Sequence, residues 1–358
     1  MKNSLKLRFL NFNCTFNKTI NQLMYLYLFL FLINKFNLIF QTFINPIDTK
    51  VTQTYKEIFL GDPTILMENN KYYLYGSSAG GIDSTANGFS VYESSNLKDW
   101  EPKGYALKKG DAYGESGFWA PQVFKKDNLF YMVYVANENI ALAKSNSPLG
   151  PFKSKLKNYF LSDTKLIDPF IFYDNNTWYL FHVRRLKEGN EIYVIELNED
   201  LSEFKKQTLT KCFSADELWE NSDGIDSKSV QGPSVCKFNN VYYLFYSANN
   251  FRSPNYAVGL ATSSSPLGPW KKSNKNPLID QKAIDKNGPG HGDLFFDLKD
   301  KKLKYVLHTH YSKNKLRPRK VGILDLSIDI NLNTLNAEVK SFRYLKKDPP
   351  PHQNTGER

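Results

Sequence analysis

The chain has 358 residues and a formal net charge of +11, and its aromatic residues include 22 Tyr and 26 Phe. The charge does not indicate nucleic-acid binding, because the lysines are scattered over predicted turns and form no basic helix and no mixed basic and aromatic motif. The three cysteines and five histidines lack the spacing of a zinc site, so none is predicted.

The N-terminal segment, residues 1–47, differs from the rest of the chain. It has no acidic residue before Asp48 and carries the apolar runs Leu23–Ile33 and Phe36–Phe43. A basic start followed by an apolar run is typical of a signal peptide. We therefore expect a secreted or periplasmic protein that makes no stable membrane contact after signal removal. An N-terminal anchor through residues 24–43 is the alternative.

A hairpin is predicted directly after this segment. Residues 61–68 form an apolar run that begins Gly-Asp-Pro, and a polar turn at Glu68–Lys71 leads to a second run rich in Tyr. β-branched and aromatic residues on both sides of an Asn-Asn pair are typical of a β-hairpin.

The same pattern recurs along the chain, which indicates a repeat architecture. Each copy also has a second half with two further strands, so each predicts a four-stranded blade. The copies begin with the hairpins Gly61–Ser78, Ala120–Tyr134, Asp168–Phe181, Gly232–Tyr246 and, in degenerate form, Gly292–Leu307.

The repeat predicts an all-β protein, a five-bladed β-propeller of four-stranded antiparallel blades, over residues 48–342. A long β-sandwich is the alternative. Because a propeller must hide its sheet edges, we expect residues 48–60 and 331–342 to close the ring. Residues 343–358, which include a Pro-Pro-Pro run, are predicted to be a disordered tail.

The positions just before the first strand of each blade should converge on one face of a propeller. They are occupied by Asp62, Ala120, Asp168, Gln231 with Gly232, and His291 with Asp293. Two carboxylates at one channel mouth suit inverting glycoside hydrolysis. Alternatively, Asp62 and Asp168 only cap turns before proline.

Five motifs in chain order make residues 55–330 resemble glycoside hydrolase family 43. They are Gly61–Ile65, Phe118–Pro121, Ile167–Phe170, Gly232–Ser234 with Tyr242–Asn249, and Gly290–Gly292. The resemblance implies an inverting five-bladed enzyme that acts on α-L-arabinofuranosides, β-xylosides or some galactosides. It also implies that Asp62 is the general base, that Asp168 orients the acid and tunes its pKa, and that His291 lies beside a channel calcium ion (Ca²⁺) bound mostly through water.

The resemblance fails at the general acid. The family has Glu before Gly-Pro, whereas this chain has Gln231. A carboxamide has no acidic proton to give at neutral pH. Glu220, or Glu217 beside it, is the nearest alternative acid in the sequence.

Four residues are candidates for substrate binding. Trp119 could stack on a sugar ring or fill the core. Phe251 and Arg252 follow a predicted strand and could line the rim, and Arg319 could reach a sugar hydroxyl.

The sequence therefore predicts an inverting glycoside hydrolase that releases arabinofuranosyl, xylosyl or galactosyl units from poly- or oligosaccharides. A carbohydrate-binding propeller that has lost its general acid at Gln231 is the alternative. A propeller with only protein partners ranks last, because it would not need Asp62 and Asp168 at equivalent blade positions.

Overall fold

The computed structural model describes residues 56–78, 87–155, 160, 162–226, 228–329 and 334–347. The chain divides into two units, Met1–Thr54 and Tyr55–Arg358, and all described residues belong to the second. The predicted signal or anchor segment, residues 1–47, lies outside them. No helix in the described part of the chain is long and apolar enough to cross a membrane.

Nearly all regular structure is β, in groups of consecutive strands that pair antiparallel. The first groups contain β2 (Gly61–Glu68), β3 (Lys71–Ser77), β4 (Gly88–Ser94) and β5 (Asp99–Lys108), then β6 (Trp119–Lys126), β7 (Leu129–Ala136) and β8 (Asn139–Ser145). Next come β9 (Lys165–Asp174), β10 (Thr177–Arg185), β11 (Gly189–Leu197) and β12 (Thr210–Phe213). The last groups contain β13 (Lys228–Phe238), β14 (Val241–Ala248), β15 (Ala257–Ser263) and β16 (Lys271–Lys272), then β17 (Gly290–Asp297), β18 (Lys302–Thr309), β19 (Lys320–Asp329) and β20 (Thr334–Tyr344).

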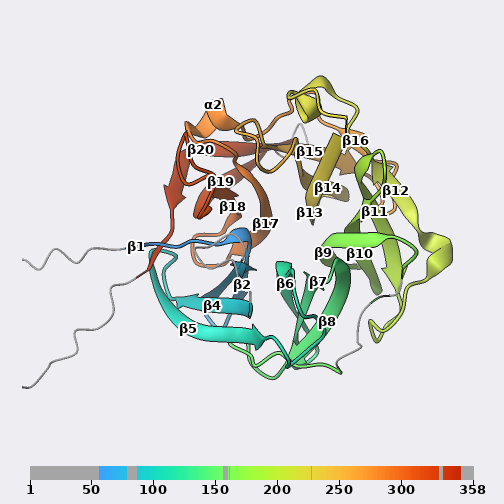
Figure 1. Cartoon of the computed structure of the whole chain (residues 1–358), viewed down its shortest axis with the longest axis vertical. Helices are drawn as coiled ribbons and strands as arrows, with labels where there is room; N and C mark the ends of the chain where they lie inside the picture. Colours follow the sequence, from blue (N-terminus) through green and yellow to red (C-terminus); the bar gives the residue numbers. More distant parts are fainter. Residues whose placement is uncertain are drawn as a thin grey trace, which may run out of the picture. The chain divides into compact units, whose positions relative to one another are not determined.

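The first strands of these groups surround a common centre. Strand β2 contacts β6, β6 contacts β9, β9 contacts β13, β13 contacts β17, and β17 contacts β2 again. Figure 1 shows these strands innermost, with later strands of each group further out. The prediction of an all-β propeller is confirmed, and the closed cycle of contacts is what a ring of blades requires.

The predicted hairpin turns have the backbone geometry that their sequence indicates. Asn69 and Asn70 have φ of 50° and 60°, and Asn239 and Asn240 have φ of 48° and 60°. Two successive left-handed residues form the turn that matches strand twist, and Asn tolerates this conformation.

The core lies between neighbouring groups of strands. One cluster joins Tyr75 and Phe89 of the first group to Met132 and Tyr134 of the second. Because both faces of a middle strand are covered, β14 reads Val-Tyr-Tyr-Leu-Phe-Tyr-Ser-Ala and is buried at every position after the first. Its continuous apolar run follows from this two-sided burial.

Both ends of the described chain complete the outer edge of the first group. Strand β1 (Lys56–Glu57) pairs with β21 (Lys346–Lys347), which lies parallel to β5. The prediction that the disordered tail begins at residue 343 was wrong. Residues 343–347 lie in or between strands, and Leu345 is 1% exposed. Pairing at the sheet edge outweighs the polar composition there, and residues 348–358 lie outside the described residues.

Candidate active site

A β-bulge recurs at the inner end of the first strands and directs the candidate residues to one place. The pairing of β2 with β3 shifts between Gly61 and Thr64, and similar shifts occur in β6, β13 and β17. Left-handed φ angles mark equivalent positions: 47° at Asp62, 42° at Ala120, 53° at Asp168 and 33° at His291. Bulges of this kind re-aim side chains beside active sites.

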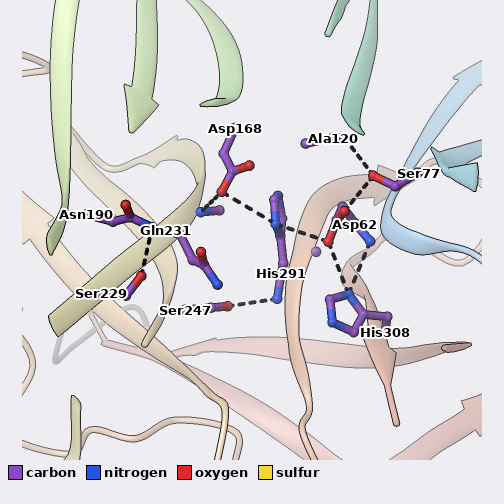
Figure 2. A network of polar contacts seen from close by, with 12 residues as sticks. Asp62, Ser77, Ala120, Asp168, Asn190, Ser229, Gln231, Ser247, His291 and His308 are labelled. Carbon is purple, nitrogen blue, oxygen red and sulfur yellow. Dashed lines mark hydrogen bonds and ion pairs between the residues drawn. The ribbon is translucent and has the colours of Figure 1, made fainter. Parts of the chain in front are cut away.

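The Asp62 carboxylate is held by two side chains from other segments of the chain, and its backbone N–H is held by a third. Arg319 donates from Nη1 to Oδ1 at 2.9 Å and from Nη2 to Oδ2 at 3.3 Å. Ser77 donates to Oδ2 at 2.5 Å while its Oγ accepts the backbone N–H of Ala120, and the backbone N–H of Asp62 donates to His308 Nδ1 (Figure 2). These contacts fix the carboxylate in one orientation.

The charges around Asp62 keep it ionised. Burial alone would raise the pKa of Asp62, but the Arg319 guanidinium, together with His291 and the Ser77 hydroxyl, holds this pKa far below its usual range. His308 itself is fully buried, and burial beside Arg319 lowers the pKa of His308 well below its usual value, so its imidazole is neutral. Asp62 is therefore a carboxylate at any ordinary pH.

Asp168 lies on the other side of His291 and has a different environment. His291 Nδ1 lies 3.3 Å from Asp62 Oδ1 and 3.7 Å from Asp168 Oδ2 (Figure 2). The Gly232 backbone N–H also donates to Asp168 Oδ2 at 3.2 Å. Burial, together with the Asp62 charge, raises the pKa of Asp168. The two aspartates thus line one pocket, and their pKa values shift in opposite directions.

Gln231 lines the same pocket, and the residue is 9% exposed. Its Nε2 donates to the Tyr256 hydroxyl at 2.8 Å. Burial, with Asp62 and Asp168 nearby, raises the pKa of Tyr256 well above its usual value, so this hydroxyl keeps its proton. Gln231, at the position where the family has its acid, is therefore largely shielded from solvent but faces the pocket, and it has no acidic proton.

Glu220 does not reach the pocket, and the prediction that it could be the alternative acid was wrong. Its side chain is fully buried, and Oε2 accepts from Lys272 Nζ at 2.6 Å while Oε1 accepts from Tyr246 at 2.7 Å. It also caps the 3₁₀ helix η3 (Leu218–Asn221) by accepting the backbone N–H of Glu217. Glu217 itself accepts from Trp219 Nε1 and does not line the pocket.

We expect Glu220→Gln to destabilise the protein without slowing the folded enzyme. The change removes the ion pair between the buried Glu220 and Lys272, which keeps Asp216 and the Ser214 carbonyl as partners. Breaking a buried ion pair typically costs about 3–5 kcal/mol, and the remaining partners of Lys272 should place the loss at the lower end of that range. Urea unfolding measures the loss, and Glu217→Gln, in the same loop but without an ion pair, should cost less. A Glu220→Gln variant of normal stability and greatly reduced turnover would contradict this structural role.

The predicted substrate-binding residues all line the pocket, which has a volume of about 760 Å³. Phe251 and Arg252 line it, and Trp119 lines it while also packing against a core cluster. Arg319 is bound to Asp62 instead of being available to a sugar hydroxyl. Sequence reasoning missed Ser77 and Tyr256, since neither lies in a motif that points to the site.

His291 does not form a calcium site made of protein groups. Calcium prefers six to eight oxygen ligands, and His291 offers one nitrogen that faces two carboxylates, one of them already bound by Arg319. Within the described residues, no cluster of three or more His, Cys, Asp or Glu side chains could hold a metal ion. A calcium ion held mostly through water stays a prediction, and no step below depends on it.

Known proteins share this sequence and architecture. The model of a family described as Glycosyl hydrolases family 43 matches residues 53–328. The structure of an endo-1,4-β-xylanase from Bacteroides thetaiotaomicron VPI-5482 is 38% identical with a TM-score of 0.75, over 82% of this chain and 98% of that one. A β-D-galactofuranosidase of Aspergillus niger is 25% identical over 77% of this chain and 82% of its own length. An arabinan endo-1,5-α-L-arabinosidase A of Aspergillus niger is 24% identical over 71% of this chain and 82% of its length.

Proposed function

Because the chain belongs to glycoside hydrolase family 43, we propose that it releases arabinofuranosyl, xylosyl or galactosyl units from poly- or oligosaccharides with inversion at the anomeric carbon. The observation that carries this proposal is the placement of Asp62 and Asp168 on either side of His291 Nδ1 in one pocket. A volume of about 760 Å³ lies in the usual range of ligand pockets.

In this proposal Asp62 takes the proton from the attacking water. Its carboxylate is ionised and oriented by Arg319 and Ser77. Oδ2 accepts from both side chains, whereas Oδ1 accepts a hydrogen bond from Arg319 Nη1 and has a further lone pair for that proton. A general base oriented in this way typically contributes about 10²–10⁴-fold to the rate.

Asp168 is a positioning residue in the same scheme. It accepts the Gly232 N–H directly after Gln231 and lies beside His291, so it holds the backbone at the acid position and the ring between the carboxylates. Its charge also favours the protonated form of any neighbouring acid.

Protonation of the leaving oxygen is the weak step of this site. Gln231 cannot supply the proton, and Glu220 and Glu217 lie outside the pocket lining. Among the described residues that line the pocket, the third carboxylate is Glu115, which is exposed at the rim and paired with Lys109 at 2.8 Å. We therefore propose that the enzyme is fastest on glycosides whose leaving group needs little protonation.

Gln231 also supports a second candidate function, a carbohydrate-binding propeller with little or no turnover. The amide and the Tyr256 hydroxyl would then serve as hydrogen-bonding groups for a bound sugar.

A screen on aryl α-L-arabinofuranosides, β-D-xylosides and galactosides tests the proposal. We expect hydrolysis of at least one class, with rates that rise steeply as the phenol becomes more acidic, because a better leaving group needs less protonation. Calorimetric binding of the parent sugars is measured beside it. Binding without hydrolysis would favour the binding module, and neither binding nor hydrolysis would contradict both candidates.

A further inference from the structure

Two arginines of the pocket wall have no anionic partner. Arg252 follows β14 and Arg317 precedes β19, and both are exposed where they line the pocket. Neither side chain has a hydrogen bond or ion pair with another described residue. The other cations of the pocket differ, because Arg319 binds Asp62, Lys109 binds Glu115, and Arg185 binds Glu138.

The two arginines belong to one positively charged side of the pocket. Two guanidinium groups lie near the Phe251 ring, with Arg252 Cζ 4.7 Å and Arg319 Cζ 5.7 Å from its centroid. Partial burial, together with the positive charges of Arg319 and Arg252, lowers the pKa of Arg317, and the Asp62 charge opposes this shift. All three guanidinium groups line the same pocket, where their like charges repel one another, and Asp62 is already bound by Arg319.

We infer that Arg252 and Arg317 bind an anionic substituent of the substrate, either the carboxylate of a uronic acid or a sulfate ester. A guanidinium presents its N–H donors in a planar fork that matches both anions. A neutral sugar would leave the repulsion between the arginines unrelieved, whereas an anion would relieve it. This inference rests on the proposed function, because it names the class of sugar that the same pocket takes.

Matched methyl glycosides test the inference by calorimetry, with the full chain and no dependence on turnover. The first set is the methyl galactoside, the methyl galacturonide and the methyl galactoside 6-sulfate, which differ only at C6. The second pair is methyl xyloside and methyl glucuronide, which differ by one carboxylate. We expect an anionic member to bind roughly 10- to 100-fold more tightly than its neutral partner, as charged hydrogen bonds typically allow, and the preference to fall as salt is added.

The variants Arg252→Gln and Arg317→Gln, singly and together, should remove this preference, measured for each variant as the ratio of anionic to neutral sugar affinity. Lys98→Gln removes the same charge from an exposed residue that does not line the pocket, and should leave the preference intact. The tighter of the two anions identifies carboxylate or sulfate as the substituent. Equal binding of neutral and anionic sugars would overturn this inference alone, and no binding of any sugar would overturn it together with the proposed function.

Discussion

Asp62→Asn is expected to lower the hydrolysis rate by about 10²–10⁴-fold, because the amide cannot accept the proton of the attacking water. The measurement is kcat/KM on the best aryl glycoside found in the screen, expressed per folded enzyme. Asn keeps the size of the side chain and can still accept from Arg319 or Ser77. A variant that keeps more than a third of the wild-type rate would show that Asp62 is not the general base and only caps the turn before Pro63.

Asp62→Asn should also lower the free energy of unfolding, and the size of this loss should depend on pH. The pKa of Asp62 is lower in the folded protein than in the unfolded chain. The Asp62 carboxylate therefore stabilises the fold at pH values above its unfolded pKa, and this stabilisation is lost only as pH falls towards its folded pKa. Asp62→Asn should therefore be less stable than the wild type at neutral pH, and the difference should shrink in strong acid.

Two controls distinguish the effect of losing the general base at Asp62 from the effect of losing its ion pair with Arg319. Asp174→Asn removes an ion-paired carboxylate outside the pocket, bound by Lys237 at 2.9 Å and by Tyr242, and should lower stability but keep the turnover. Added azide should restore turnover of Asp62→Asn on activated substrates, since an anionic nucleophile needs no base. An Asp62→Asn variant that azide cannot rescue, although it folds and binds sugar, would contradict the role of Asp62 as base.

Gln231→Glu is expected to raise the rate on natural linkages by up to about 10²–10⁴-fold, the usual contribution of a general acid. The introduced carboxyl is isosteric, and the Tyr256 hydroxyl can donate to it in place of accepting from the amide. Burial and the charges of Asp62 and Asp168 should raise the pKa of the new group, so it stays protonated as an acid. The rate should then fall as pH rises through that pKa, which the wild type should not show.

The substrates chosen for this variant decide its interpretation. Oligosaccharides with alkyl leaving groups should gain most, and aryl glycosides with acidic phenols should gain little. Adding Asp168→Asn to Gln231→Glu should lower the pKa of the introduced acid and cancel part of the gain. If the wild type is already fast on oligosaccharides and Gln231→Glu does not change its rate, the proposal that the site lacks a general acid is contradicted. His291 or Asp168 would then be the proton donor.

The sequence by itself was sufficient for the features that depend on neighbouring residues. Paired Asn residues between apolar runs indicated the hairpins, because a left-handed turn and strand alternation are local properties. The repeat of these hairpins placed Asp62, Asp168, Gln231 and His291 at equivalent positions, and the structure brings all four to one pocket. The substitution at the acid position is visible in the sequence alone.

Only the tertiary structure decided which groups surround those residues. Arg319 and Asp62 are 257 positions apart in the chain, and their ion pair exists because β2 packs against the last group of strands when the ring closes. Glu220 is near Gln231 in sequence, yet Lys272 and Tyr246 hold it buried outside the pocket. Sequence distance does not predict such contacts, because a closed ring joins the first and last strands and orients each loop by packing that no local pattern records.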